Sequence, residues 1–168
     1  MCLLVISNYF EKLDPSRLLC VSRRVNELIN GARVDGRPLA FLQSQNGASF
    51  DSVGIRIGRY EPIFTTCDRG EMMPSGLIDF IVCHAASQVH LAGVAALSQF
   101  EQLGHALHRS GYTAVIEAET TFLAGSARSG DASGVGSLHQ FKENDAFTGS
   151  PLIWSASIKN QSTRWPNA

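Results

Sequence analysis

Charged residues are scarce in this chain of 168 residues. Asp, Glu, Lys and Arg together make up 17% of the sequence, against about 25% in a typical soluble domain. The formal net charge is −1, so the molecule has no cationic field that would gather nucleic acid or anionic lipid. A surface with so few charges predicts that another copy of the chain covers part of it, and we therefore expect a homo-oligomer.

Long hydrophobic runs are absent as well. No apolar stretch approaches the roughly 20 residues that a membrane-spanning helix requires, and the apolar start of the chain lacks the basic segment of a secretion signal. Hydrophobic residues nevertheless make up 44% of the sequence, which is enough for a core without disulfides. We expect one soluble globular domain over residues 1–168 with no membrane partner.

The four cysteines are widely spaced, and none belongs to a Cys-x-x-Cys pair. They are Cys2, Cys20, Cys67 and Cys83. This spacing fits neither a zinc site nor the disulfide framework of a small secreted protein, so free thiols in a reducing cytoplasm are the expectation. The sequence also lacks a glycine-rich phosphate-binding motif, and we expect no cofactor and no bound metal.

Two segments have the spacing of amphipathic helices. Asp14 and Pro15 form a typical helix start, and apolar residues then recur every three or four positions, which predicts a helix over 15–30. A second apolar stripe predicts a long helix over 88–109, which ends before Gly111. These two helices are expected to pack on the same face of a sheet.

Alternating or continuous apolar runs predict the strands of that sheet. The expected strands are a buried first strand at 1–7, a hairpin formed by 38–43 and 53–58, and further strands at 63–67, 77–85, 113–121 and 151–158. The stretch 124–148 is rich in Gly and Ser and predicts a flexible loop.

Helices mixed with hairpin-like strands favour an α+β domain of two layers. In this arrangement a mixed or largely antiparallel sheet carries both helices, 15–30 and 88–109, on one face. A doubly wound α/β sheet is the alternative.

The segment around Cys83 is the strongest candidate for chemistry. If 77–85 is a strand and a helix begins at 88, then His90 lies in the first helical turn. The crossover from strand to helix can bring it near the strand end, where it could act as a base for the Cys83 thiol. The positive end of that helix would favour a thiolate, and Asp79 shares the strand face of Cys83. We therefore expect a catalytic site of Cys83, His90 and Asp79. A cysteine that only packs in the core is the alternative.

Two further groups of side chains have suggestive spacing. Glu101, His105 and His108 share one helical face and could bind a metal ion, but this face points away from the apolar stripe, which favours a solvated surface. Glu117 and Glu119 share one face of the strand 113–121 and could serve acid–base chemistry. A solvent-facing strand edge is the alternative for this pair.

The sequence leads to two functional hypotheses. The first is a small cytoplasmic thiol-dependent enzyme that acts on an acyl or amide group. The second is a noncatalytic oligomeric module that binds a small molecule between the sheet and the long helix. Both hypotheses make a small molecule the partner and exclude nucleic acid.

Overall fold

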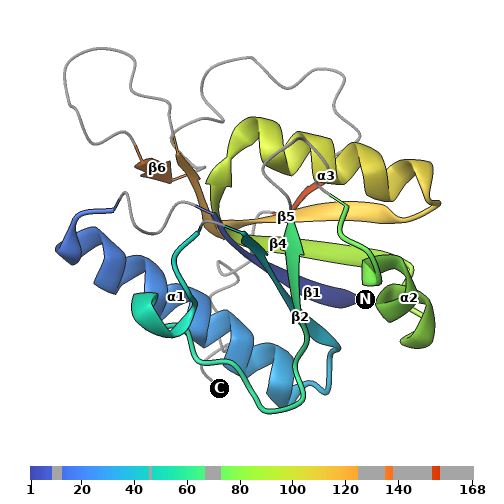
Figure 1. Ribbon diagram of the computed structural model, residues 1–168, viewed down its shortest axis with the longest axis horizontal. Helices are drawn as coiled ribbons and strands as arrows, with labels where there is room; N and C mark the ends of the chain where they lie inside the picture. The colour runs from blue at the N-terminus through green and yellow to red at the C-terminus, as the bar shows by residue number, and fades with distance from the viewer. Residues whose placement is uncertain (9–12, 46, 67–72, 125–134, 138–152, 156–168) are drawn as a thin grey trace, which may run out of the picture.

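Five parallel strands form the centre of the protein in the computed structural model (Figure 1), which describes residues 1–8, 13–45, 47–66, 73–124, 135–137 and 153–155. Their order in the sheet is β3-β2-β1-β4-β5. The bounds of these strands are β1 (Cys2–Ser7), β2 (Leu39–Ser44), β3 (Ile63–Thr66), β4 (Gln88–Ala96) and β5 (Thr113–Ala124). Two short strands pair with β5, namely β6 (Val135–Ser137), which is antiparallel to it, and β7 (Ile153–Ser155), which is parallel.

Helices cover both faces of the sheet. One face carries α1 (Pro15–Val34), and the other carries α2 (Leu77–Cys83) and α3 (Leu97–Arg109) (Figure 1). A single 3-10 turn, η2 (Asp51–Val53), lies in the connection between β2 and β3. The expected α+β domain is therefore wrong, because β1 to β5 are mutually parallel and the helices do not share a face. Parallel neighbours need long crossover connections, and these place helices on the sheet faces.

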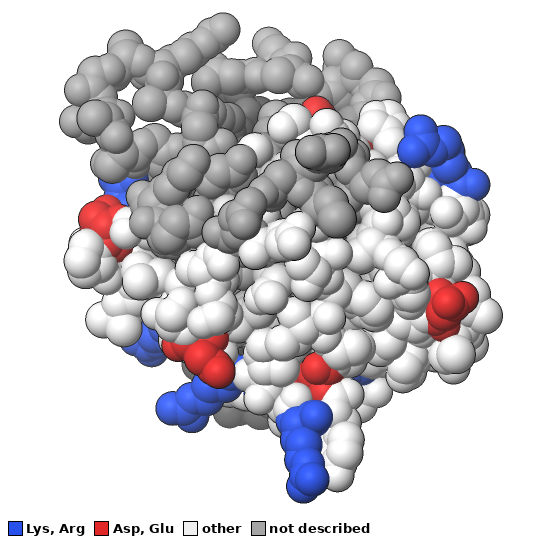
Figure 2. Space-filling view, viewed as in Figure 1, with Lys and Arg blue, Asp and Glu red and all other residues white. Residues whose placement is uncertain are grey.

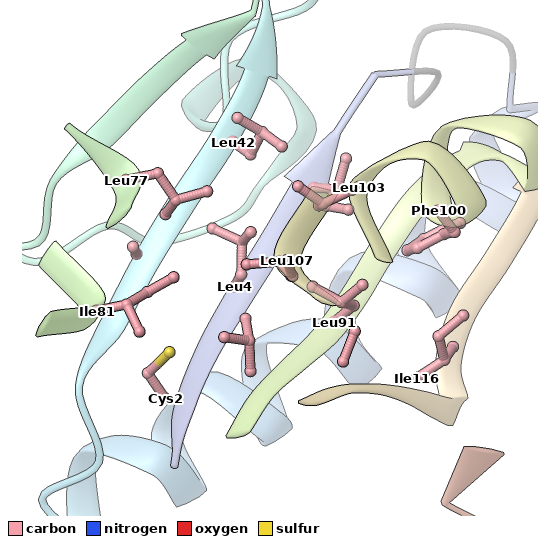
Figure 3. Packing of buried hydrophobic residues seen from close by; sticks show 14 of the residues in the cluster. Cys2, Leu4, Leu42, Leu77, Ile81, Leu91, Phe100, Leu103, Leu107 and Ile116 are labelled. Carbon is pink, nitrogen blue, oxygen red and sulfur yellow. The ribbon is translucent and has the colours of Figure 1, made fainter. Parts of the chain in front are cut away.

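The core consists of two hydrophobic layers, one on each side of the sheet. The layer under α2 and α3 is shown in Figure 3, where both helices direct leucine, isoleucine and phenylalanine side chains onto the strands. Its labelled members include Leu4, Leu42, Leu77, Ile81, Leu91, Phe100, Leu103, Leu107 and Ile116. The layer under α1 contains Leu3, Val5, Val21, Val25, Ile29, Phe41, Phe50, Ala92 and Val94.

The first helix is confirmed and is longer than expected. Asp14 caps it, because its carboxylate accepts a hydrogen bond from the Arg17 backbone N–H at 3.0 Å. The helix does not end at Gly31 but continues to Val34, and the extra turn buries Ala32. The expected strands at 1–7, 38–43, 63–67 and 113–121 correspond to β1, β2, β3 and β5.

Two neighbouring elements are reversed relative to the sequence-based expectation. The expected strand 77–85 is helix α2, and the first part of the expected helix 88–109 is strand β4, so that α3 begins only at Leu97. Residues 89, 91, 92, 94 and 95 of β4 are all buried. A strand that is buried on both faces has a continuous apolar sequence without a period of two. The apolar residues of β4 therefore also fit the spacing of a helix, which explains the wrong expectation.

The expected hairpin is also wrong, since β2 pairs in parallel with β3 and not with residues 53–58. Side chains of α1 bind the backbone groups that a second hairpin strand would have used. The Ser22 hydroxyl donates to the Val53 carbonyl at 2.6 Å. The Asn26 side chain donates to the Gly54 carbonyl at 2.8 Å and accepts from the Arg56 N–H at 3.1 Å. We call residues 53–61 the stitched loop.

An ion pair closes the stitched loop onto the end of α1. Arg33 donates from Nε to Oε1 of Glu61 and from Nη2 to Oε2, each at 2.7 Å. The same carboxylate accepts from the Gly58 N–H, and Arg33 also donates to the Arg56 carbonyl at 2.8 Å. The hydrogen bonds from Arg33 hold the pKa of Glu61 below its usual value.

Most of the expected loop 124–148 and of the expected strand 151–158 lies outside the described residues. Within 124–148 the structure describes only Ala124 and β6. Within 151–158 it describes only β7.

Candidate ligand-binding site

The strand order places a switch point between β1 and β4. From β1 the chain proceeds to β2 and β3 on one side, and then returns to β4 and β5 on the other side. In open α/β sheets, ligands bind outside the carboxyl ends of the strands at such a point. The relevant residues are therefore Ser7 and Asn8 after β1, and the junction of β4 with α3.

Ser7 and Asn8 are buried polar residues at this edge. Their exposed fractions are 0% and 5%. Among the described residues, the Ser7 hydroxyl and both polar atoms of the Asn8 amide have no hydrogen-bond partner. The Asn8 backbone is fixed, because its N–H donates to the Val94 carbonyl at 3.0 Å. Buried polar groups in native proteins are nearly always hydrogen-bonded, so these three atoms indicate a place where a ligand or water binds.

The end of β4 lies unusually close to β1. Gly93 has a φ of +110°, and a Cβ at this position would lie 2.1 Å from the Ile6 carbonyl oxygen. Only glycine fits here, because a side chain would collide with the neighbouring backbone. This close approach fixes the path of β4 just before the chain turns into α3.

The amino-terminal end of α3 follows at the same edge. Ala96 precedes the helix and has no side-chain acceptor of its own, while the Gln99 side chain accepts a hydrogen bond from the Ala96 N–H at 3.1 Å. The first N–H groups of a helix carry partial positive charge. The edge therefore offers hydrogen-bond donors beside Ser7 and Asn8.

The ends of β2 and β3 complete the edge with uncharged polar groups. Thr66 is buried, and its hydroxyl donates to the Gln43 carbonyl at 3.4 Å. The Gln45 N–H donates to the Thr66 carbonyl at 3.1 Å. Gly47 lies close to Ser7, since a Cβ on it would be 3.2 Å from the Ser7 carbonyl oxygen. None of the residues named at this edge is ionisable, so the edge offers hydrogen-bonding groups and no side-chain charge.

The sequence did not lead us to Ser7 or Asn8. The available signal was the position of two polar residues directly after the apolar run Cys2–Ile6. A polar residue at the end of a buried strand points toward the carboxyl edge of a parallel sheet, but only if the strand is known to be central and parallel.

The structure does not bring the expected thiol site together. Cys83 is the exposed last residue of α2, and His90 lies within β4 and not at a helix start. Val89 and Leu91 face the layer under α2 and α3, so His90 between them faces the α1 side of the sheet. Only Asp79 lies near Cys83, four residues earlier on α2. The shared catalytic role of the three residues stays a prediction, without geometric support.

His90 pairs instead with Glu117 of β5. Its Nδ1 lies 2.5 Å from a carboxylate oxygen of Glu117, and the two side chains are 13% and 19% exposed. Glu117 is thus the partner of a histidine, and the side chain of Glu119 lies outside the described residues. The parallel register of β4 with β5 creates this pair, and the expected helix at 88 had concealed it.

The possible metal ligands on α3 lie on its outer side. His105 and His108 are exposed, and Glu101 is partly exposed. In the described part of the chain, no three His, Cys, Asp or Glu residues are placed so that they could hold a metal ion. The solvated helix face is therefore the better description.

No described helix is long and apolar enough to cross a membrane.

Neither a protein-family model nor a curated protein matches this chain, whereas solved structures do. The crystal structure of an isochorismatase family protein matches with a TM-score of 0.67 and 20% identity, over 92% of this chain and 97% of the other. The fold is isochorismatase-like.

Two further matches are named for amide compounds. N-carbamoylsarcosine amidase from Thermoplasma acidophilum has a TM-score of 0.60 and 12% identity, over 96% of this chain and 99% of that one. The nicotinamidase from Staphylococcus aureus has a TM-score of 0.56 and 14% identity, over 71% of this chain and 80% of that one. Identities this low establish likeness of fold.

Proposed function

We propose that the chain binds a small molecule through an amide group at the carboxyl edge of β1 and β4. The observation that carries this proposal is the trio of buried side-chain atoms on Ser7 and Asn8 that have no partner among the described residues. The Asn8 amide offers one acceptor and a donor group side by side. An amide ligand can satisfy both, because its N–H binds Oδ1 while its carbonyl binds Nδ2.

The same geometry favours an amide over a carboxylate. A carboxylate has only acceptors, so its second oxygen would face the Asn8 Oδ1 without a hydrogen between them. The Ser7 hydroxyl can donate or accept, and it adapts to the remaining group of the ligand. Two structural neighbours are named for amide compounds, which supports the same class of ligand.

Benzamide and benzoate form a matched pair of probes, since they differ only in the group that Asn8 would contact. We expect calorimetry to detect benzamide binding and at least roughly tenfold weaker benzoate binding, because an unmet buried polar group costs about 1–3 kcal/mol. Asn8→Leu, which keeps the side-chain size, should abolish the preference. Equal affinities for the two probes, or an unchanged preference in Asn8→Leu, would refute the proposal.

Hydrolysis of the bound amide or acyl group is a second candidate function, favoured by the hydrolase names of the structural neighbours. Hydrolysis through a covalent intermediate needs a nucleophile and an activating base. At the edge, Ser7 and Thr66 supply hydroxyl groups, and the residues named there include no base. Binding is therefore the primary proposal, and release of ammonia from benzamide or nicotinamide tests the second.

The thiol-dependent form of this hydrolase has its own test. Iodoacetamide labelling of Cys83 is followed against pH in the parent and in His90→Ala. Because the two residues face opposite sides of the sheet, we expect identical profiles, and Cys83→Ser should leave any ammonia release unchanged. A labelling profile that shifts in His90→Ala would restore the catalytic role of this pair.

A further inference from the structure

β3 forms an open edge of the sheet in the described part of the chain. It pairs only with β2. The carbonyls of Pro62 and Thr66 accept hydrogen bonds from the β2 side, from Phe41 and Gln45. Alternate residues of a strand point their backbone groups to opposite sides, so the N–H and C=O groups of Ile63 and Thr65 point away from the sheet.

Apart from its length of only four residues, this edge carries none of the side-chain features that protect a strand from pairing. Natural edge strands carry lysine, an inward-pointing charge, a bulge or a proline that blocks an outward N–H. Residues 63–66 are Ile-Phe-Thr-Thr, without a charge. Pro62 does not block the edge, because its carbonyl binds the β2 side and the first outward N–H belongs to Ile63.

Apolar side chains are exposed on β3 and just before it. In Figure 1, β3 lies at the front of the molecule, and the same view in Figure 2 shows uncharged side chains across the middle of this face, with acidic and basic groups below them. Ile63 is 47% exposed and Tyr60 is 89% exposed. Uncharged side chains of this kind can meet identical ones without repulsion between like charges.

We propose that β3 pairs antiparallel with β3 of a second copy of the chain, around a two-fold axis at Phe64. In this register Ile63 lies opposite the partner's Thr65, and Thr65 opposite the partner's Ile63. Each of these pairs exchanges two hydrogen bonds through the outward backbone groups. The two sheets then form one continuous sheet across the dimer.

The side chain at the axis supports a second copy as the occupant. Phe64 lies opposite the partner's Phe64 as a pair without hydrogen bonds, in which side chains approach most closely. The Phe64 ring is already held by an edge-on contact with Phe80 of α2, at 6.0 Å between ring centres. A two-fold pairing of identical edges closes after two subunits, so no β3 edge is left for a third copy.

Thr65→Pro tests the proposal without disturbing the fold. The Thr65 N–H points outward, so proline removes a dimer hydrogen bond and none between β2 and β3. Ile63→Lys adds a like-charge pair near the axis as a second disruption. Leu19→Lys is the control, because Leu19 is 74% exposed on α1.

Sedimentation velocity over a concentration series measures the dimer, and hydrogen exchange of the Ile63 and Thr65 amides locates it. We expect a parent dimer, at least roughly tenfold weaker association in both β3 variants, and unchanged association in Leu19→Lys. The two amides should be protected only at concentrations where the dimer forms. A parent that stays monomeric at micromolar concentration, or a dimer that survives both β3 substitutions, overturns the proposal.

Discussion

Replacing Ser7 by alanine should stabilise the protein in the absence of ligand. Removal of a buried side chain usually lowers the free energy of unfolding. Ser7 is different, because its hydroxyl is 0% exposed and lacks a partner among the described residues. The folded state carries the desolvation penalty of this hydroxyl, and Ser7→Ala removes that penalty.

Two terms decide the magnitude. An unsatisfied buried hydroxyl costs about 1–3 kcal/mol, and the lost packing of one oxygen atom offsets up to about 1 kcal/mol of the gain, at 0.1–0.2 kcal/mol per contact. The net effect is an increase of about 1 kcal/mol in the free energy of unfolding. For a chain of this size, that increase raises the melting temperature by roughly 2–4 °C.

Ser22→Ala is the matched control. Ser22 is also buried, with 6% exposed, but its hydroxyl donates to the Val53 carbonyl at 2.6 Å. Its removal leaves that carbonyl without a donor and should lower the free energy of unfolding by about 1–3 kcal/mol. The two serine substitutions therefore have opposite expected signs.

Urea denaturation with and without benzamide measures both effects. We expect Ser7→Ala to be more stable than the parent without benzamide and to gain less stability when benzamide is added, because a ligand that binds the folded state stabilises it. If Ser7→Ala is destabilised as much as Ser22→Ala, the Ser7 hydroxyl stabilises the fold, which contradicts its place in a ligand-binding edge.

Three further predictions concern the fold. Gly93→Ala should lower the free energy of unfolding by more than about 4 kcal/mol or prevent folding, because the new Cβ would lie 2.1 Å from the Ile6 carbonyl oxygen. A near-normal midpoint of urea denaturation would show that β1 and β4 can separate to make room for it. Phe100→Ala should cost about 3–5 kcal/mol, since its ring is fully buried under α3, and thermal denaturation checks this. Because Arg33 lowers the pKa of Glu61, the stabilisation from this carboxylate is present above its unfolded pKa of about 4.3 and is lost as the pH falls through the lower folded value. Glu61→Gln should therefore flatten the fall in stability below about pH 4, and an unchanged acid profile would contradict the pairing.

Local signals were sufficient for some elements. Asp14 and Pro15 at the start of α1, and its apolar stripe, depend on nearby residues only, so the sequence predicts this helix correctly. The strands β1, β2, β3 and β5 also follow from short apolar runs. What these signals do not contain is the pairing of the strands, and the hairpin and the largely antiparallel sheet were wrong for this reason.

The candidate site depended on information that lies outside any local window. Cys83 and His90 are close in sequence, but the exchange of helix and strand between 77 and 96 separates them onto opposite faces. Ser7 and Asn8 become notable only through burial without partners, which is a property of the folded chain. The pairing of His90 with Glu117 likewise requires the register of β4 with β5.

The stitched loop has a consequence for how the protein opens locally. Its last residue, Glu61, is held by Arg33 near the end of α1 and lies two residues before β3 begins. A strand with one neighbour usually frays independently of the core, but β3 cannot leave the sheet far without breaking the Arg33 ion pair. The edge strand and the last turns of α1 should therefore open as one cooperative unit, with the same opening free energy in native-state hydrogen exchange. Glu61→Gln should separate them, so that β3 exchanges at lower free energy while α1 keeps its protection.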